Sequence, residues 1–269
     1  MPEGDTIFRT ATTLRAALAG RAVASFRAPR LGAATIATGT TVTAVEARGK
    51  HLLIWFDDGR VLHTHMQMSG SWHVYRPGER WRASRATARV VIEVPETVAV
   101  CFRAPVVEIL DARAVRAHPR LSALGPDLCS PSADLDEALA RLERLPPDTP
   151  IAIALLDQRV ACGVGNVYKS ETLFACRVDP FARVVDLDAA TRRELLAKAS
   201  ELLRRNLQGG SRATYEGGLA VYGRAGRACR RCGATIRSAA QGQLPRRTYW
   251  CPACQPELGR AQASGEGSG

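Results

Sequence analysis

Residues 229–254 read CRRCGATIRSAAQGQLPRRTYWCPAC and determine the fold of the C-terminal region. They contain two C-x2-C pairs separated by 18 residues: Cys229, Cys232, Cys251 and Cys254. Each pair can present two thiolates to one ion, and four thiolates close a tetrahedral zinc site that has no open position. We therefore expect one structural Zn2+, with a β-hairpin between the pairs that carries Arg246 and Arg247 on its second arm.

Upstream of the cysteines, the pattern from residue 151 onward is helical. Helices are predicted at 151–159, 166–176 and 189–206, and the break LPPDTP at 145–150 marks a domain boundary. The Gly-rich segment GVGNVYK at 163–169 opens the middle helix. Backbone N–H groups at such a helix start can bind phosphate, although an ordinary connection between two helices gives the same pattern.

The N-terminal part has a different pattern. Residues 4–19 have helical apolar spacing, and residues 111–145 are also expected to be helical. Between them lie short β-like runs separated by turn residues. These runs are 41–47, 51–56, 60–66, 88–94, 97–102 and 106–110. Six short strands in succession indicate a β-sandwich or a barrel.

The charge distribution favours a polyanionic partner. The chain has 269 residues and a formal net charge of +11, and residues 201–250 hold ten Arg against two Glu. Clustered arginine is typical of nucleic-acid binding, although a solvated basic surface has the same composition. No apolar run approaches the ~20 residues that span a bilayer, and the N-terminus does not resemble a signal peptide. We expect a soluble, intracellular protein.

The first residues are chemically unusual if the initiator methionine is removed. Pro2 would then carry a free secondary amine with an α-amine pKa of about 8, so that part of it is neutral and nucleophilic at pH 7. Condensation of that amine with an aldehyde gives a cationic iminium ion. Glu3 would stand beside it as a proton donor or acceptor. A Met-Pro start without any function is the alternative.

Five motifs together resemble one known family. They are MPEG at 1–4, RGKHLL at 48–53, GVGNVYKSE at 163–171, YGRAGRACRRCG at 222–233 and YWCPAC at 249–254. In this order they resemble the formamidopyrimidine-DNA glycosylase/endonuclease VIII family over nearly the whole chain. The resemblance implies an α+β fold: an N-terminal β-sandwich flanked by helices, then a helical helix–two-turns–helix domain with a C-terminal zinc finger.

The resemblance and the pattern together divide the chain into five segments. They are a catalytic β-sandwich domain (2–117), a helical linker (118–150), the helix–two-turns–helix domain (151–222), the four-cysteine zinc finger (223–255) and a disordered tail (256–269).

The resemblance also implies a reaction in base-excision DNA repair. The family excises oxidised bases and then cleaves the strand at the abasic site, as a DNA glycosylase and an abasic-site lyase. Pro2 would attack C1′ of the damaged nucleotide, with Glu3 as its acid/base partner. The resulting Schiff base would promote successive β- and δ-elimination, which splits a difficult step into easier ones.

Further residues match the phosphate contacts of the family. Lys50 matches the hairpin lysine that is required for activity. Gly165 and Asn166 lie where the helix–two-turns–helix motif binds phosphate, and Arg246 matches the zinc-finger arginine around the lesion. Such contacts bend the duplex and stabilise an everted nucleotide.

The substrate class follows from a departure within the family. The purine-preferring branch carries a motif close to DPRRFG, and this chain lacks it. Its absence favours the endonuclease VIII branch and oxidised pyrimidines. Gln67, Met68 and Ser69 occupy the place of the residues that fill the void in the helix. Because Ser69 is short, we expect weak dependence on the opposite base, with activity extending to single-stranded or bubble DNA.

A second departure affects base excision. The family usually has a glutamate at the place of Thr6, where it is thought to help open the sugar ring. Asp5 could compensate for its absence, or could only cap the first helix, where an acid favours the helix dipole. Alternatively, Thr6 lowers base excision and leaves abasic-site cleavage intact.

Damaged DNA is the expected partner, and the protein is expected to act as a monomer without membrane contact. The expected location is the bacterial cytoplasm, at the nucleoid. The rival hypotheses are an abasic-site lyase with weak glycosylase activity and a zinc-finger protein that binds lesions without cutting. The pair Pro2 and Glu3, together with Lys50, favours the enzyme, because a pure binder has no need of an amine beside a carboxylate.

Overall fold

The computed structural model describes residues 2–32, 34–243 and 245–257. The contacts within the chain define two compact units, Met1–Ala123 and Leu124–Gly269. Initiator Met1 and most of the expected disordered tail, from residue 258 onward, lie outside the described residues. The division into the five segments given above stays a prediction.

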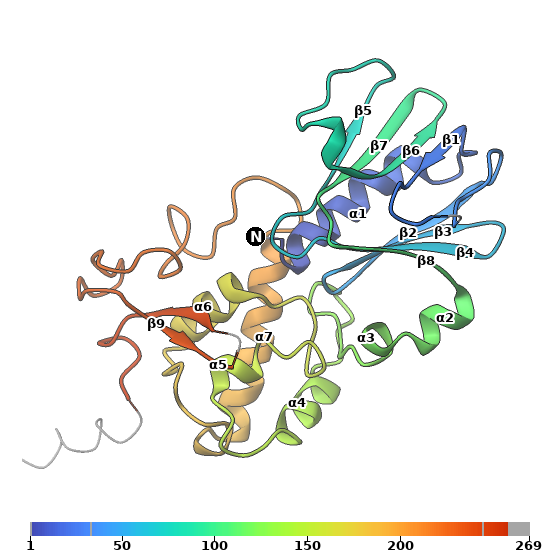
Figure 1. Cartoon of the computed structure of the whole chain (residues 1–269). Helices are drawn as coiled ribbons and strands as arrows, with labels where there is room; N and C mark the ends of the chain where they lie inside the picture. The colour runs from blue at the N-terminus through green and yellow to red at the C-terminus, as the bar shows by residue number, and fades with distance from the viewer. Residues whose placement is uncertain (1, 33, 244, 258–269) are drawn as a thin grey trace, which may run out of the picture. The chain divides into compact units, whose positions relative to one another are not determined.

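The first unit is a two-sheet sandwich with helices. Its helices are α1 (Gly4–Leu18), η1 (Arg85–Thr87), α2 (Ala112–Ala117) and α3 (Pro119–Ser122). Its strands are β1 (Ser25–Arg27), β2 (Val42–Arg48), β3 (His51–Phe56), β4 (Arg60–His65), β5 (Ser71–Tyr75), β6 (Ala88–Val94), β7 (Thr97–Phe102) and β8 (Val106–Asp111). One sheet has the order β1-β6-β7-β5 and the other β2-β3-β4-β8 (Figure 1).

Apolar side chains of the two sheets form the core of this unit. Leu52, Ile54 and Leu62 of one sheet and Ile92 of the other are buried in the same cluster. Helix α1 contacts strands of both sheets. Its buried residues Ile7, Ala11, Leu14 and Leu18 recur at helical spacing along one face, which fixes its orientation on the sandwich.

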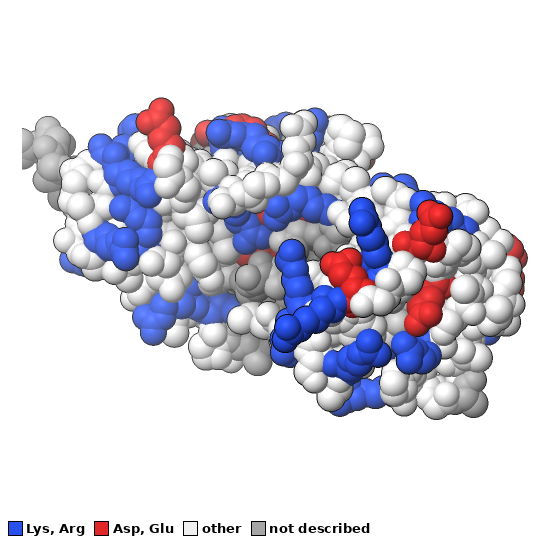
Figure 2. Space-filling view, turned by 90° about the horizontal axis from the view of Figure 1, so that it is seen from above, with Lys and Arg blue, Asp and Glu red and all other residues white. Residues whose placement is uncertain are grey.

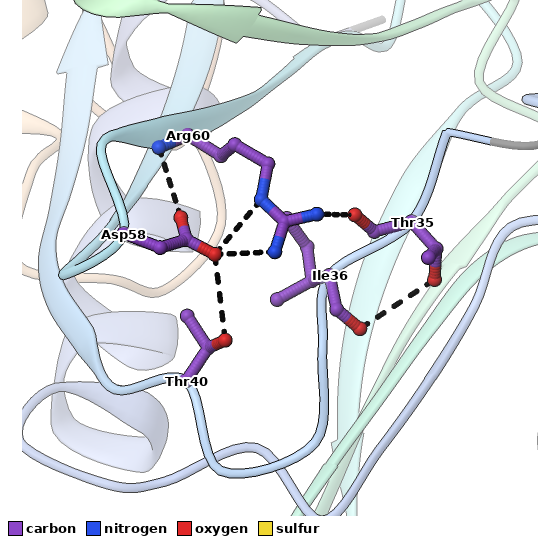
Figure 3. A network of polar contacts seen from close by, with 5 residues as sticks. All are labelled: Thr35, Ile36, Thr40, Asp58 and Arg60. Carbon is purple, nitrogen blue, oxygen red and sulfur yellow. Dashed lines mark hydrogen bonds and ion pairs between the residues drawn. The ribbon is translucent and has the colours of Figure 1, made fainter.

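A polar network fastens the β3–β4 hairpin to the neighbouring loop (Figure 3). The guanidinium of Arg60 pairs with the Asp58 carboxylate and also donates to the carbonyl of Thr35. The Thr40 hydroxyl donates to the same carboxylate at 3.4 Å. The Arg60 hydrogen bonds hold the pKa of Asp58 below its usual range, against the effect of its slight burial. Residues 57–59 form the turn between β3 and β4.

The second unit is mainly helical. Its helices are α4 (Leu135–Glu143), α5 (Ile151–Ala154), α6 (Asn166–Ala175), η2 (Val184–Asp186) and α7 (Ala189–Arg205). Its strands β9 (Arg237–Gln241) and β10 (Arg246–Trp250) form the antiparallel hairpin expected between the cysteine pairs. Helix α6 contacts α5, α7 and β10. It is therefore the central element of this unit.

The structure confirms the α+β class and differs from the sequence prediction in four elements. The sandwich contains two further strands, β1 and β5. Strand β1 has only three residues, too few to show a periodic pattern, and β5 follows directly on a turn with mixed polarity. The helix expected at 151–159 ends at Ala154, and the stretch 111–145 is helical only in α2, α3 and α4.

The surface carries many basic side chains. On the face in Figure 2, Lys and Arg side chains are spread widely, with Asp and Glu among them. Among the described residues, no helix combines the length and apolar character needed to cross a membrane.

Candidate functional site

The N-terminal candidates lie at the start of α1. Pro2 is half-buried, and Glu3 is fully buried and forms the N-cap of the helix. The Glu3 carbonyl accepts from the N–H of Ile7 at 3.0 Å, whereas its carboxylate makes no capping hydrogen bond. The carboxylate is thus buried next to Pro2, and it does not cap the N–H groups of the first helical turn.

Asp5 and Thr6 lie in the first turn of α1. Asp5 is fully buried, while Thr6 is half-buried. The Thr6 hydroxyl donates to Oδ1 of Asp5 at 3.3 Å, and Arg9 lies 3.6 Å from Oδ2. Asp5 therefore is not the helix cap, because the capping position belongs to Glu3. Its negative charge still lies at the favourable end of the helix dipole.

Lys50 occupies the tight turn between β2 and β3. It follows Gly49, whose φ of 57° is the left-handed conformation that glycine adopts without strain. Its side chain is half-buried, and the next residue, His51, begins β3. Two paired strands thus fix the backbone on both sides of this lysine.

The candidates Gln67, Met68 and Ser69 form one exposed turn after β4. Gln67 has a φ of 46°, and the side chain of Met68 is 67% exposed. The Ser69 hydroxyl donates to the carbonyl of Arg103 at 3.3 Å, which ties the turn to the β7–β8 connection. Next comes Gly70, where a Cβ would lie 2.8 Å from backbone atoms of Met66. Only glycine fits there, so the turn is sharply defined.

In the second unit the start of α6 is joined to strand β10. Gly165 is the N-cap, and Asn166 is the first helical residue and is buried. The Asn166 amide donates to the carbonyl of Arg247 at 2.8 Å. The ammonium of Lys169 donates to Oδ1 of Asn166 at 2.7 Å and to the hydroxyl of Thr248 at 2.8 Å. The predicted phosphate contacts Asn166 and Arg246 are thereby brought to neighbouring elements.

Arg246 is exposed at the first position of β10, opposite Gln241. Arg247 is also exposed, and its guanidinium donates to the Ser238 hydroxyl at 3.0 Å. Both arginines project from a short hairpin whose backbone is tied to α6. They are therefore cations on a rigid element.

Glu171 of α6 holds a loop of this unit in place, a role that sequence reasoning missed. Its buried carboxylate accepts hydrogen bonds from the N–H groups of Ala220, Val221 and Tyr222 at 2.7–2.9 Å, and also from the hydroxyl of Thr214. It holds the loop that leads into the first cysteine pair. The motif GVGNVYKSE contains both Glu171 and Lys169. Both are charged residues on a helix that is almost wholly buried, and such residues need polar partners inside the protein.

The four predicted zinc ligands meet at one point. The Sγ atoms of Cys229 and Cys254 are 4.0 Å apart, those of Cys232 and Cys251 are 3.5 Å apart, and all four lie within 4.8 Å of one another. A tetrahedral site with Zn–S bonds of about 2.3 Å places its sulfurs about 3.8 Å apart. The four cysteines can hold one metal ion of that size.

Two models of one protein family match the chain. The formamidopyrimidine-DNA glycosylase N-terminal domain matches residues 1–106, and its H2TH domain matches residues 124–216. A probable endonuclease 8 2 of Streptomyces coelicolor is 43% identical over 263 residues, covering 95% of this chain and 94% of that protein. The chain belongs to the formamidopyrimidine-DNA glycosylase/endonuclease VIII family.

Two further comparisons describe the place of the chain in this family. It is 38% identical to the DNA-(apurinic or apyrimidinic site) lyase Nei2 of Mycolicibacterium smegmatis, over 95% of this chain and 99% of that protein. The resemblance to the endonuclease VIII branch is thus confirmed. The Lactococcus lactis Fpg in complex with DNA containing an abasic site has the same fold, with a TM-score of 0.81, 21% identity and coverage of 95% and 100% of the two chains.

Proposed function

We propose that this member of the family is a bifunctional DNA glycosylase and abasic-site lyase that removes oxidised bases, pyrimidines in preference. The observation that supports the proposal best is the buried carboxylate of Glu3 immediately after Pro2, at the start of a helix packed against both sheets. An amine with a free lone pair, next to a carboxylate shielded from water, is suited to covalent catalysis with proton transfer.

The proposed reaction begins when the nitrogen of Pro2 attacks C1′ and the glycosidic bond breaks. The base leaves with a proton, for which Glu3 is the nearest candidate acid. Opening of the sugar ring gives an iminium ion between Pro2 and C1′. Loss of the C2′ proton then expels the 3′ phosphate, and a second elimination expels the 5′ phosphate. Water hydrolyses the remaining iminium and regenerates the amine.

The proposed DNA contacts belong to rigid parts of each unit. Lys50 would bind phosphate from the β2–β3 turn of the first unit. In the second, phosphates would be bound by the start of α6 at Gly165 and Asn166, and by Arg246 on β10. Backbone N–H groups at a helix start and a guanidinium on a fixed strand are both suited to phosphate oxygens.

The exposed turn at 67–69 supports the proposed substrate range. Gln67 and Met68 would enter the base stack vacated by the lesion, and the 67% exposure of Met68 leaves its apolar side chain free of the core. The hydroxyl of the short Ser69 side chain donates to the carbonyl of Arg103 at 3.3 Å. The grip on the opposite strand would then be weak, which supports activity on single-stranded and bubble DNA.

The metal that suits the four cysteines is a single structural Zn2+. Four thiolates complete its coordination, so that its role is to hold the hairpin and not to activate water. Arg231 and Gln255, which adjoin the two pairs, donate to the carbonyls of Phe174 and Val178 at 3.1 and 2.8 Å. The metal would thereby fix Arg246 relative to α6.

Borohydride trapping tests this function. The protein is incubated with an oligonucleotide that contains one abasic site, the adduct is reduced, and its peptides are mapped by mass spectrometry. We expect the adduct on the nitrogen of residue 2 after removal of Met1. An adduct on one of the three lysines, or intact binding without any adduct, would contradict the mechanism. Excision from duplex, bubble and single-stranded thymine glycol substrates tests the substrate range.

Thr6 supports a second candidate, an abasic-site lyase with weak base excision. The hydroxyl of Thr6 is directed to Asp5 at 3.3 Å and cannot replace a carboxylate in proton transfer to the sugar. If Asp5 does not supply this function, cleavage of a pre-formed abasic site would exceed base excision. The ratio of the two rates, measured on the same duplex, separates the candidates.

A further inference from the structure

Four of the five histidines of the chain gather with one carboxylate on the first unit. They are His51, His63, His65, His118 and Glu108. In the sheet β2-β3-β4-β8, His63 lies opposite Glu108 and His51 lies opposite His65. Because alternate residues share a face, these side chains lie on the side away from the sandwich core. Helix α2 contacts β4 and β8 of this sheet, and His118 follows α2 in the chain (Figure 1).

The hydrogen bonds among Glu108, His63 and His51 determine which ring nitrogen donates and which accepts. Nδ1 of His63 lies 2.9 Å from Oε2 of Glu108, and Nε2 of His63 lies 2.8 Å from Nδ1 of His51. A carboxylate only accepts, so Nδ1 of His63 carries its proton. The Nε2 of a neutral His63 must then accept, and Nδ1 of His51 must donate. Both rings are therefore Nδ1–H tautomers.

The other two rings have the opposite tautomer. Nδ1 of His118 accepts from the N–H groups of Arg120 and Leu121 at the start of α3, at 3.2 and 3.3 Å. Its proton therefore lies on Nε2, which is 3.3 Å from Oε2 of Glu108. Nδ1 of His65 accepts from the N–H of Gln67 at 3.2 Å, so His65 also carries its proton on Nε2.

These hydrogen bonds argue against a metal ion bound by His63, Glu108 and His118. His63, Glu108 and His118 have nitrogen and oxygen atoms close enough to share an ion. However, Nδ1 of His118 already accepts two backbone N–H groups, so metal binding through Nε2 would require a fully deprotonated ring or the loss of the α3 cap. A ring that binds a metal normally donates its other N–H. The cluster is thus a set of hydrogen-bonded neutral imidazoles.

The cluster lies between two parts of the proposed DNA-binding surface. His51 directly follows Lys50, and Lys50 acts electrostatically on His65. His65 in turn holds the N–H of Gln67, the first residue of the exposed turn. The rings of His51 and His65 are in edge contact, with centroids 4.6 Å apart. The two DNA-facing turns are therefore supported by adjacent rings of one network.

We propose that Glu108, His63 and His51 are positioning residues. Through His65, they hold the Lys50 turn and the Gln67–Ser69 turn in the positions that the chemical step requires. The proposal rests on the glycosylase/lyase function given above. Glu108 fixes the tautomer of His63, which fixes that of His51. His51 packs against His65, which holds the exposed turn.

Protonation would disrupt this arrangement bond by bond. A proton on Nδ1 of His65 would face the N–H of Gln67, and a proton on Nε2 of His63 would face the N–H of His51. The pKa of His65 falls to about 4, first through burial and then through Lys50, His63 and Arg120. Burial is also the main cause that lowers the pKa of His51, to about 2. Around neutral pH these rings are therefore neutral.

Histidine side-chain NMR tests the tautomers independently of activity. Long-range 1H–15N spectra of the 15N-labelled, zinc-loaded protein should show Nδ1–H rings for His51 and His63 and Nε2–H rings for His65 and His118. We expect His51 and His65 to stay neutral down to pH 5. The opposite tautomers, or protonation of His65 near pH 6.5, would overturn the proposal. So would a shift of His63 and His118 on addition of one further equivalent of Zn2+.

Substitutions of Glu108 test the positioning role. Glu108→Leu removes the acceptor, whereas Glu108→Gln retains an oxygen at the same place. We expect Glu108→Leu to lower the single-turnover cleavage rate at saturating enzyme by roughly 10- to 100-fold, since small displacements cost this much. Glu108→Gln should recover most of that rate. The matched control is Glu93→Leu in β6, a carboxylate of similar exposure (36% against 41%) outside the cluster.

The outcomes distinguish a positioning role of Glu108 from a role in stability alone, and also from a failure of the proposed glycosylase/lyase function. A Glu108→Leu protein with a lower melting temperature but an unchanged rate would refute the positioning role. A rate loss that Glu108→Gln does not recover would also refute it, because the hydrogen-bond acceptor would then not matter. If the unmodified protein neither excises bases nor forms a borohydride adduct, the proposed function fails, and the positioning role fails with it. The spectra still decide the tautomers.

Discussion

The ammonium of Lys169 lies 2.7 Å from Oδ1 of Asn166 and 2.8 Å from the hydroxyl of Thr248, and it is fully buried. It thus joins the first turn of α6 to strand β10. The bond to Oδ1 also fixes the orientation of the Asn166 amide, since an ammonium can only donate. The NH2 group of Asn166 then faces the carbonyl of Arg247.

Replacement of Lys169 by Met should weaken DNA binding without changing its salt dependence. The substitution removes the ammonium that donates to Oδ1 of Asn166 and to the Thr248 hydroxyl, and a buried acceptor that loses its donor costs about 1–3 kcal/mol. Because Lys169 is buried, it neutralises no phosphate. We therefore expect a lower affinity, with the same slope of log K against log salt from fluorescence anisotropy. A shallower slope would show that Lys169 itself contacts the backbone of the DNA.

Arg246→Gln should lower the slope of log K against log salt, which Lys169→Met should leave unchanged. An exposed guanidinium that neutralises one phosphate contributes about 0.9 to the salt slope on duplex DNA. We expect the slope to fall by about that amount, with a parallel loss of affinity for damaged and undamaged duplexes. Arg237→Gln, in the other strand of the same hairpin, is the matched control and should keep the slope. Equal effects of both substitutions would indicate only general attraction to DNA.

Removal of the metal should release the hairpin while the sandwich stays folded. The zinc-finger cluster contains Cys229 and Cys251 with few apolar partners, so its structure depends on the ion. We expect about one zinc per chain by mass spectrometry of metals, and loss of zinc and of DNA affinity in Cys251→Ser. Cys176→Ser, at a thiol outside the cluster, should retain both. Full zinc retention by Cys251→Ser would exclude this ligand.

Much of this architecture was accessible from the sequence, because it is local. The cysteine spacing predicted the hairpin β9–β10, and apolar spacing predicted α1, α6 and α7 with ends within a residue or so. The candidate residues Pro2, Lys50 and Asn166 followed from motifs. Contacts between distant segments were not accessible. No pattern indicates that Lys169 reaches Thr248, or that Glu171 binds the N–H groups of residues 220–222.

The histidine network is a second feature that the sequence alone could not predict. His63 and His65 are two residues apart in β4, as polar positions on a solvated sheet face would be, and His51 starts β3. In the structure α2 contacts β4 and β8 of this sheet, and His51 and His63 are buried and hydrogen-bonded to each other. Burial by a short helix cannot be inferred from strand periodicity.

Thr6→Glu should raise base excision relative to abasic-site cleavage. A carboxylate in place of the Thr6 hydroxyl would lie beside the buried Asp5 and could transfer a proton to the opening sugar. We expect the ratio of excision to lyase rate to rise by roughly 100-fold, the lower end of what general acid–base catalysis typically contributes. Asp5→Asn is the companion variant. If Asp5 already performs this role, Asp5→Asn will abolish excision, and Thr6→Glu will leave the ratio unchanged.

The buried histidines should make the protein less stable in mild acid. Burial lowers the pKa of His51 to about 2 and of His65 to about 4, and it also lowers that of His63, from 6.5 in an unfolded chain. Below pH 6.5 the unfolded state therefore binds more protons than the folded state. The contribution of these rings to the free energy of unfolding should be constant above this pH and fall as the pH drops, by at most about 1.4 kcal/mol per pH unit for each ring.

Urea unfolding at pH 7.5, 6 and 5 measures this loss, and His51→Leu provides the comparison. The variant removes one of the rings that must stay neutral, so the decline of its unfolding free energy between pH 6 and 5 should be smaller by about 1 kcal/mol. Zinc thiolates also take up protons in this range. Since His51→Leu leaves the cysteine cluster intact, the difference between the two proteins cancels that contribution. Parallel declines would mean that His51 titrates in the folded protein as it does in the unfolded chain.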